Sequence, residues 1–306
     1  MLRDLCDGLP APRPPDMPPK APAGWAELAA ALPDTGRVLL LGSPDCGKTT
    51  LGWWLARQLQ RRGTVALVDA DVGQSRIGPP ASVGWYRPGD RRQGFFFVGS
   101  VSPERRPATA LQATRRAHDI AAEAARFVVV DTTGYLHGRT AIALKGAKIE
   151  HLRPVHVVAM GDGDEDLQAV LAPWSGDRAV TIHRLLGPSG ARTRSVEVRA
   201  GWRQEAFATW LSGANLRWVE LAGRETLHEP EPELYAGDKA GQLEGLLVGF
   251  GDERDNALCI GLLHRLDLGK RRMLCLCPEQ AAGAARVDFG CLRPHPDGRQ
   301  IASEER

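Results

Sequence analysis

The sequence predicts an α/β fold in which a parallel sheet is flanked by helices on both faces and is followed by a small C-terminal β domain. Two observations lead to this class. From Arg37 to about residue 212, short runs of branched apolar residues alternate with helical stretches, as expected for buried parallel strands joined by helices. From residue 213 onward, turn residues such as Gly251-Asp252 separate the apolar runs, which is typical of an antiparallel domain.

The elements of the first domain follow from these apolar runs and from the helical stretches between them. Val38-Leu-Leu-Leu41 is a typical buried strand, and the helix that follows is expected to end at Arg61-Arg-Gly63. The expected strands are 38–41, 65–68, 95–98, 127–130 and 155–159, and the expected helices are 24–32, 49–60 and 108–126.

The rest of the chain divides into a tail and a second domain. Seven prolines within 1–22, with few large apolar residues, predict a mobile segment. The expected strands of the β domain are 243–250, 257–266, 273–277 and 285–292. We therefore divide the chain into a flexible proline-rich tail (1–24), an α/β domain (25–212) and a β-rich domain (213–306).

Composition excludes several classes of protein. With 43% hydrophobic and 25% charged residues, the 306-residue chain can bury a large core, which excludes a disordered, collagen-like or coiled-coil protein. No apolar stretch approaches the roughly 18 residues of a membrane span, so we expect no membrane association. Six cysteines without a CxxC pair suggest neither a zinc site nor a disulfide framework, and we expect a cytoplasmic location. The net charge of +2 neither favours nor excludes a nucleic-acid partner.

Residues 42–50 match the phosphate-binding pattern GxxxxGK[ST] between an expected strand and an expected helix. Glycine lets the backbone wrap round a phosphate without a Cβ clash, and the loop amides and the helix N-terminus then face the anion. Lys48 can reach the β- and γ-phosphates of a nucleotide, and the Thr49 hydroxyl can ligate Mg²⁺. The residues expected to bind the nucleotide are Gly42, Ser43, Pro44, Asp45, Cys46, Gly47, Lys48, Thr49 and Thr50.

Acidic residues stand at the ends of two further strands. Asp69 and Asp71 follow one apolar run, and Asp131 follows another. The carboxyl ends of parallel strands face the ligand crevice of an open α/β sheet. Asp69 and Asp71 would share a strand face, where one could hold Mg²⁺ while the other accepts a proton from an attacking hydroxyl; a solvated turn is the alternative. Asp131 could bind Mg²⁺ as the second element of a P-loop NTPase, or could simply cap a loop.

Further motifs narrow the class of P-loop protein. No [NT]KxD motif occurs, so a guanine-specific GTPase is not expected. GxxDxGKTT is followed by DADVGQSRIGPP at 69–80, FFFVGSVSP at 95–103 and DTTGY at 131–135. Together these motifs resemble the Clp1/Grc3/Nol9 family of polynucleotide 5′-hydroxyl kinases, over about 25–292. The resemblance implies Mg²⁺-dependent transfer of the ATP γ-phosphate to the 5′-hydroxyl of RNA or DNA.

The resemblance also implies roles for individual residues. Lys48 and Thr49 match the family's P-loop lysine and metal-binding hydroxyl. Asp71, in DxDxGQ, matches the carboxylate that activates the 5′-hydroxyl, and Gln74 belongs to the same motif with its role open.

Thr132-Thr-Gly134-Tyr135 matches the family's TxGW clasp, which holds the terminal nucleotide. The chain departs from the family here, because Tyr135 replaces tryptophan. Tyrosine still has a π face on which a base can stack, although the smaller ring could weaken the clasp or change the base preference. A half-buried loop aromatic is the alternative.

Arg199-Ala-Gly-Trp-Arg203 fits the family's lid pattern RxxxR. The resemblance implies that one of these arginines acts like an arginine finger on the moving phosphoryl group and the other holds a phosphate oxygen. RxxxR is a weak pattern in an arginine-rich chain, and Arg184, Arg192 and Arg194 are alternatives. Four other arginines near expected crevice loops could contact a nucleic-acid backbone or simply be solvated: Arg76, Arg105, Arg106 and Arg139.

The expected partner is an RNA or DNA substrate with an accessible 5′-hydroxyl, single-stranded or at an exposed end, and no protein partner is indicated. Because the P-loop begins at residue 42, the chain resembles the compact prokaryotic form of the family rather than the eukaryotic form with its N-terminal β domain. Two alternatives stay open. One is a small-molecule kinase or amidoligase-type ATPase, and the other is an ATP-bound scaffold of RNA processing without turnover.

Overall fold

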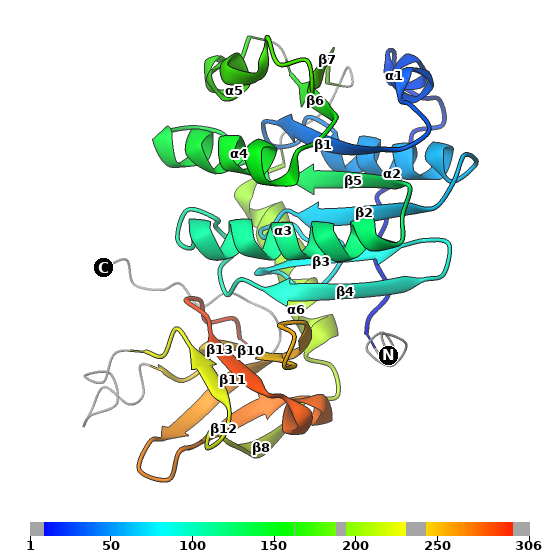
Figure 1. Ribbon diagram of the computed structural model, residues 1–306. Helices are drawn as coiled ribbons and strands as arrows, with labels where there is room; N and C mark the ends of the chain where they lie inside the picture. Colours follow the sequence, from blue (N-terminus) through cyan, green and yellow to red (C-terminus); the bar gives the residue numbers. More distant parts are fainter. Residues whose placement is uncertain (1–8, 162, 188–193, 231–242, 296–306) are drawn as a thin grey trace.

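The computed structural model describes residues 9–161, 163–187, 194–230 and 243–295, and Figure 1 shows two stacked units. One contains a seven-stranded sheet and the other a six-stranded sheet. The helices are α1 (Trp25–Ala31), α2 (Lys48–Leu59), α3 (Pro107–Glu123), α4 (Arg139–Leu152), α5 (Glu165–Leu171) and α6 (Val196–Trp210). The strands are β1 (Gly36–Gly42), β2 (Val65–Ala70), β3 (Ser82–Arg87), β4 (Arg92–Phe97), β5 (Phe127–Thr132), β6 (His156–Met160), β7 (Thr181–Leu185), β8 (Asn215–Glu220), β9 (Glu225–Leu227), β10 (Leu247–Gly251), β11 (Ala257–Asp267), β12 (Arg272–Cys277) and β13 (Arg286–Phe289).

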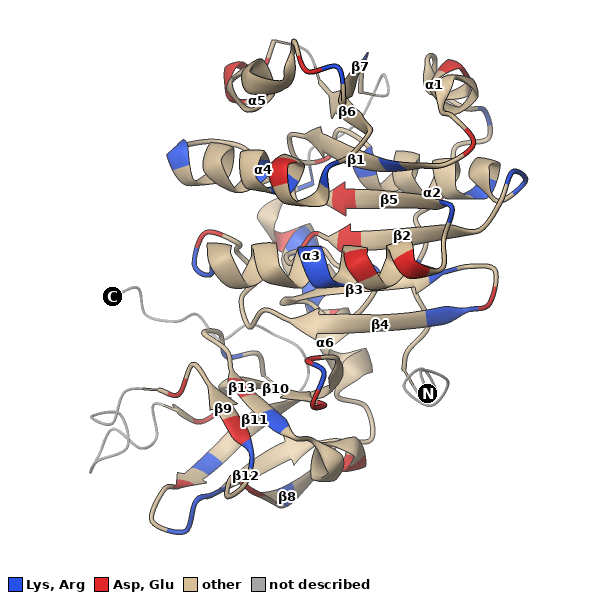
Figure 2. Cartoon of the chain, viewed as in Figure 1, with Lys and Arg blue, Asp and Glu red and all other residues tan. Residues whose placement is uncertain are grey.

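The first sheet has the strand order β4-β3-β2-β5-β1-β6-β7. The five strands β2, β5, β1, β6 and β7 run parallel. At one edge β3 and β4 form an antiparallel hairpin, and β3 pairs antiparallel with β2. The register sets Asp69 of β2 beside Asp131 of β5. Figure 2 shows acidic residues at the arrowheads of both strands, so two carboxylates meet at one edge of the sheet.

Helices cover both faces of this sheet, as the sequence predicts (Figure 1). α1 and α2 pack on one face through side chains that include Leu51 and Leu55, and α3, α4 and α5 pack on the other. Alanines spaced three or four residues apart form one stripe on α3, and their small side chains let the helix approach the sheet closely. This stripe consists of Ala110, Ala113, Ala117 and Ala121.

The second sheet has the order β8-β12-β11-β10-β13-β9. All of its pairs are antiparallel except the one between β13 and β9. Cys275 and Cys277 alternate on β12 with both thiols buried, as their spacing predicts. None of the helices described here is long and apolar enough to span a bilayer.

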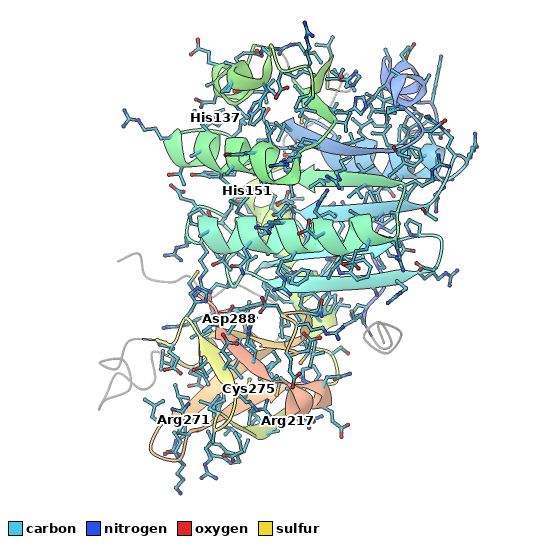
Figure 3. All side chains as sticks on the ribbon, viewed as in Figure 1. His137, His151, Arg217, Arg271, Cys275 and Asp288 are labelled. Carbon is cyan, nitrogen blue, oxygen red and sulfur yellow. The ribbon has the colours of Figure 1, made fainter. Side chains whose placement is uncertain are left out.

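Apolar and charged contacts join the two units. Phe207 of α6 and Phe95 of β4 share one apolar cluster with Leu247 and Ile260 of the second sheet. Arg106, just before α3, forms an ion pair with Asp288 of β13 at 3.7 Å, and Figure 3 shows Asp288 on the side of the β unit that faces the first sheet. The first unit is therefore braced by the second, away from the P-loop.

Several elements differ from the sequence expectation. β3 and α4 were not predicted, because Ser82–Arg87 lacks an unbroken apolar run and the buried face of α4 includes two lysines. α6 begins at Val196, so it includes both arginines of the RxxxR pattern. The sheet is not wholly parallel, since β3 and β4 form a hairpin.

The N-terminal segment was expected to be mobile over its whole length. Its described part lies against the first unit. Gln93 of β4 donates a hydrogen bond to the carbonyl of Pro10 at 3.2 Å, and the amide of Arg13 donates to the carbonyl of Arg76 at 2.9 Å. Residues 1–8 lie outside the described chain. Prolines suit this extended path, because they need no backbone donor.

Candidate active site

The P-loop joins β1 to α2, where the sequence places it. Gly42 and Gly47 both have positive φ, and a Cβ on Gly42 would meet the carbonyl oxygen of Met160, so glycine is required there. Lys48 is buried, and its Nζ donates to the carbonyl of Ser43 at 2.7 Å. The loop thus wraps round its own lysine.

Thr49 and Asp131 form the oxygen pair expected to hold a metal. The Thr49 hydroxyl donates to Oδ2 of Asp131 at 2.6 Å, and Oδ1 of Asp131 is buried without a hydrogen-bond partner in the described chain. Burial raises the pKa of Asp131 to about 6, although Lys48 nearby favours the charged form. Hydroxyl and carboxylate oxygens are ligands that Mg²⁺ prefers, and the orphaned Oδ1 is the atom that a cation would satisfy.

Asp69 does not share a strand face with Asp71 as expected. β2 ends at Ala70, so Asp69 points inward while Asp71 lies in the following turn. The Asp69 carboxylate accepts hydrogen bonds from the amides of Asp71, Arg76 and Ile77 at 2.5 to 3.1 Å. Burial, and then the neighbouring Asp131 carboxylate, raise its pKa to about 7. Asp69 therefore anchors the loop 71–77 rather than facing a ligand.

Asp71 lines the cavity beside the P-loop. Its Oδ1 accepts hydrogen bonds from the amides of Gly73 and Gln74, both at 3.1 Å. No hydrogen bond to Oδ2 occurs among the described residues, so this oxygen is free to accept a proton. Gln74 links the loop to the lid, because its Nε2 lies 3.4 Å from the carbonyl of Arg199.

The TTGY segment is split between the interior and the cavity. Thr132 is fully buried and donates to the carbonyl of Leu40 at 2.7 Å, so it does not face a substrate as expected. Thr133, Gly134 and Tyr135 line the cavity. The Tyr135 ring is partly exposed, and burial together with the neighbouring Glu104 carboxylate raises the pKa of its phenol.

The lid arginines lie on α6 and face the P-loop. Arg199 forms an ion pair with Asp45 at 2.7 Å, and the amide of Arg194 donates to the same carboxylate at 2.9 Å. Arg203 lies close enough to Asp71 for a favourable charge interaction, while burial and Arg199 lower its pKa. Both arginines of the RxxxR pattern therefore reach the site that the sequence assigned to them.

These parts surround one cavity of about 610 Å³. The expected residues that do not line it are Gly42, Ser43 and Cys46 of the P-loop, and Asp69, Asp131 and Thr132 at the strand ends. Of the arginines expected near a nucleic-acid backbone, Arg76 lines the cavity. Arg105 and Arg106 instead donate hydrogen bonds to carbonyls of the second unit. Arg192 lies outside the described residues. The cavity is lined by Pro15, Pro44, Asp45, Gly47, Lys48, Thr49, Thr50, Asp71, Gly73, Gln74, Arg76, Val101, Thr133, Gly134, Tyr135, Leu136, His137, Arg194, Arg199, Trp202 and Arg203.

Two buried lysines of α4 escaped the sequence reasoning. Lys145 and Lys148 are at most 1% exposed. Nζ of Lys145 donates to the Thr132 hydroxyl at 2.8 Å and to the carbonyl of Thr133. Burial, and then like charge from Lys148, hold the pKa of Lys145 well below its usual range. Burial lowers the pKa of Lys148 to about 8, although Asp71 and other carboxylates favour its charged form.

A signal for these lysines did exist in the sequence. The chain has only six lysines, and 145 and 148 are spaced to share one helix face. Together with Lys48, they lie near the carboxylates Asp69, Asp71 and Asp131. Several ionisable side chains gathered at one sheet edge, most of them buried, are typical of a functional site rather than of a core.

Comparison with known proteins gives consistent matches. The family model described as mRNA cleavage and polyadenylation factor CLP1 P-loop matches residues 42–213. A polyribonucleotide 5′-hydroxyl-kinase of Methanocaldococcus jannaschii is 32% identical, over 88% of this chain and 90% of that protein. Another of Pyrococcus furiosus is 26% identical, over 88% of this chain and 91% of that protein.

The fold has a counterpart among solved structures. Clp1p in the wild-type Clp1p–Pcf11p complex superposes with a TM-score of 0.66 at 11% identity. The match covers 88% of this chain and 77% of that chain. At this identity the likeness concerns the fold alone.

Proposed function

The chain belongs to the CLP1 P-loop family, and from this we propose that it is a polynucleotide 5′-hydroxyl kinase that transfers the γ-phosphate of ATP to a polyribonucleotide. One observation of the structure carries the proposal. The P-loop, the carboxylate of Asp71 and the loop of Gly134 and Tyr135 line a single cavity of about 610 Å³. A phosphate donor and a hydroxyl acceptor can therefore meet there.

The donor side is built from the P-loop and the lid. The amides of the loop and the N-terminus of α2 face the phosphates, and Lys48 would turn from the carbonyl of Ser43 to their oxygens. Thr49 and Asp131 would hold Mg²⁺, which supplies positive charge to the β- and γ-phosphates when bound. Arg199 and Arg203 would neutralise the charge that spreads over the moving phosphoryl group.

The acceptor side is built around Asp71. Backbone amides hold its Oδ1, so Oδ2 can accept the proton of the 5′-hydroxyl as the oxygen attacks the γ-phosphorus in line and the bond to ADP breaks. Tyr135 offers a ring against which the terminal base can stack. Lys145 holds Thr132 and Thr133, which come just before Gly134 and Tyr135 in the chain, through hydrogen bonds from its Nζ. Transfer needs no covalent bond to the protein, so its residues act through position and charge.

The test is transfer of label from γ-labelled ATP to 5′-hydroxyl oligonucleotides. RNA and DNA of the same sequence are compared with Mg²⁺, and GTP is compared with ATP as donor. We expect Asp71→Asn to lower kcat by about 10²- to 10⁴-fold while the Kd for ATP stays within about twofold, because proton acceptance is lost and the P-loop is untouched.

Lys48→Ala should lose both ATP binding and transfer, whereas Lys270→Ala, at an exposed turn of the β unit, should lose neither. ATP binding without transfer to any oligonucleotide would contradict the proposal. It would favour a small-molecule acceptor or a nucleotide-bound scaffold.

A further inference from the structure

Trp202 of α6 lies at the centre of an unusual cluster of positive charge. The Arg76 guanidinium carbon lies 4.3 Å from the centre of the Trp202 ring, and that of Arg194 lies 4.4 Å from it. All three side chains line the cavity. We call these three residues the arginine–tryptophan platform.

The platform carries positive charge that the described protein does not balance. Arg194 has a partner in Asp45 at 3.6 Å. Arg76 has no carboxylate within ion-pair distance in the described chain, and its Nη1 donates to the carbonyl of Arg13 at 3.3 Å. Burial, and then like charge from Arg194, lower the pKa of Arg76. Two guanidinium groups held close together in this way are favoured when an anion lies between or beside them.

The position of the platform points to the acceptor rather than to ATP. Arg76 belongs to the loop 71–77 that also carries Asp71, and Asp69 fixes the backbone of this loop through the Arg76 amide. The N-terminal segment supports the same loop, because the amide of Arg13 donates to the carbonyl of Arg76 at 2.9 Å and Pro15 lines the cavity. In the proposed mechanism the P-loop, Lys48 and Arg199 serve the triphosphate, and Arg194 joins the platform to the P-loop through Asp45.

A stacked guanidinium is well suited to a phosphate ligand. The indole face attracts the cation and holds its plane, and the N–H groups at the edge of that plane stay available for oxygen acceptors. The cavity wall as a whole is cationic, with Lys48 and four arginines against the carboxylates of Asp45 and Asp71. Such a wall fits a polyanion that extends beyond its terminal nucleotide.

Building on the proposed kinase activity, we propose that the platform binds phosphodiester groups of the polynucleotide on the 3′ side of the accepting nucleotide. Arg76 and Arg194 contact the phosphate oxygens, and Trp202 is the positioning residue that holds the two guanidinium groups. Residues 13–15 form the outer wall of this subsite. The platform therefore makes a polynucleotide a better acceptor than a nucleoside that carries no phosphate.

The experiment compares two acceptors, a nucleoside that carries no phosphate and a 5′-hydroxyl RNA oligonucleotide. The measured quantity is the ratio of kcat/KM for the oligonucleotide to kcat/KM for the nucleoside. We expect wild type to prefer the oligonucleotide, and Trp202→Leu and Arg76→Gln each to reduce this ratio about tenfold, the effect of one charge-assisted hydrogen bond. The slope of log KM against log salt for the oligonucleotide should fall by about 0.7 in Arg76→Gln.

The second unit supplies a matched control. The Arg272 guanidinium carbon lies 4.2 Å from the centre of the Trp218 ring of β8. Both residues belong to the second sheet, whereas the P-loop follows β1 of the first sheet. Trp218→Leu and Arg272→Gln should keep the wild-type ratio and slope. Trp202→Phe, which keeps an aromatic face, should restore most of the preference lost in Trp202→Leu, and thermal unfolding shows whether each variant is folded.

The outcomes separate the two proposals. If wild type phosphorylates both acceptors with equal kcat/KM, or if folded Trp202→Leu keeps the wild-type ratio and salt slope, the platform is overturned and the kinase stands. If wild type phosphorylates neither acceptor while binding ATP, the kinase itself is overturned.

Discussion

Gly134 is the point where the acceptor loop touches the P-loop, and replacing it tests the geometry of the site directly. Its φ lies outside the range that strains an L-residue, so alanine is allowed by the backbone. Space is what excludes it. A Cβ at this position would lie 2.6 Å from the Cα and N of Pro44 and 2.8 Å from its Cγ.

The size of the effect follows from these distances. Ordinary van der Waals contact begins at 3.4 Å, so Gly134→Ala must separate the two loops by about 0.8 Å. The two nearest atoms are backbone, and Cγ belongs to the proline ring, so none of them can turn away as a flexible side chain would. A misplacement of this order at a reacting centre costs about 100-fold in rate, or about 2.7 kcal/mol of transition-state stabilisation.

We therefore expect Gly134→Ala to lower kcat/KM for a 5′-hydroxyl oligonucleotide about 100-fold and to weaken ATP binding, while the circular dichroism spectrum stays native. Gly146→Ala is the matched control, because nothing lies within 4 Å of its added Cβ and the residue is helical. It should leave kcat/KM within about twofold and raise the melting temperature slightly. A folded Gly134→Ala protein with the wild-type kcat/KM would refute the packing of the two loops.

Two further predictions concern the buried charges. Lys145→Met removes the hydrogen bonds to Thr132 and Thr133, so KM for the oligonucleotide should rise about tenfold and KM for ATP much less. Steady-state kinetics measures both KM values, with Lys270→Met as control. Equal effects of Lys145→Met on the two KM values would argue against this role of Lys145. The pKa of Asp131 in the folded protein is about 6, above its value in the unfolded chain. Between about pH 4 and pH 6 the folded protein therefore holds a proton on Asp131 that the unfolded chain has lost. The free energy of unfolding of wild type should fall as pH rises through this range, by at most about 1.4 kcal/mol per pH unit. Melting temperatures in Mg²⁺-free buffer measure this trend, which Asp131→Asn should weaken; an unchanged trend in that variant would assign it to other groups.

Much of the fold could be predicted because its signals are local. In the strands 65–70 and 127–132 an unbroken run of four apolar residues is followed by an acid, and both strands lie in the parallel part of the sheet as expected. Two features depend on longer-range effects that the sequence does not reveal. Asp69 was expected to share a face with Asp71, but the strand ends between them, and four nearby donors draw the Asp69 carboxylate inward. The N-terminal segment reads as mobile by composition, although Gln93 and Arg76 supply partners that composition does not reveal.

The sequence by itself determined the P-loop, since nine consecutive residues contain everything that a phosphate needs: two glycines that free the backbone, a lysine, a hydroxyl and the start of a helix. It also determined the motif order on which the family rests. Only the tertiary structure decided which distant side chains complete the site. Lys145 reaches Thr132, Arg199 reaches Asp45 and Trp202 reaches Arg76 across 13, 154 and 126 positions, respectively. No local pattern encodes these pairs, because each depends on how the sheet brings loops together and on the energy of burying charge there.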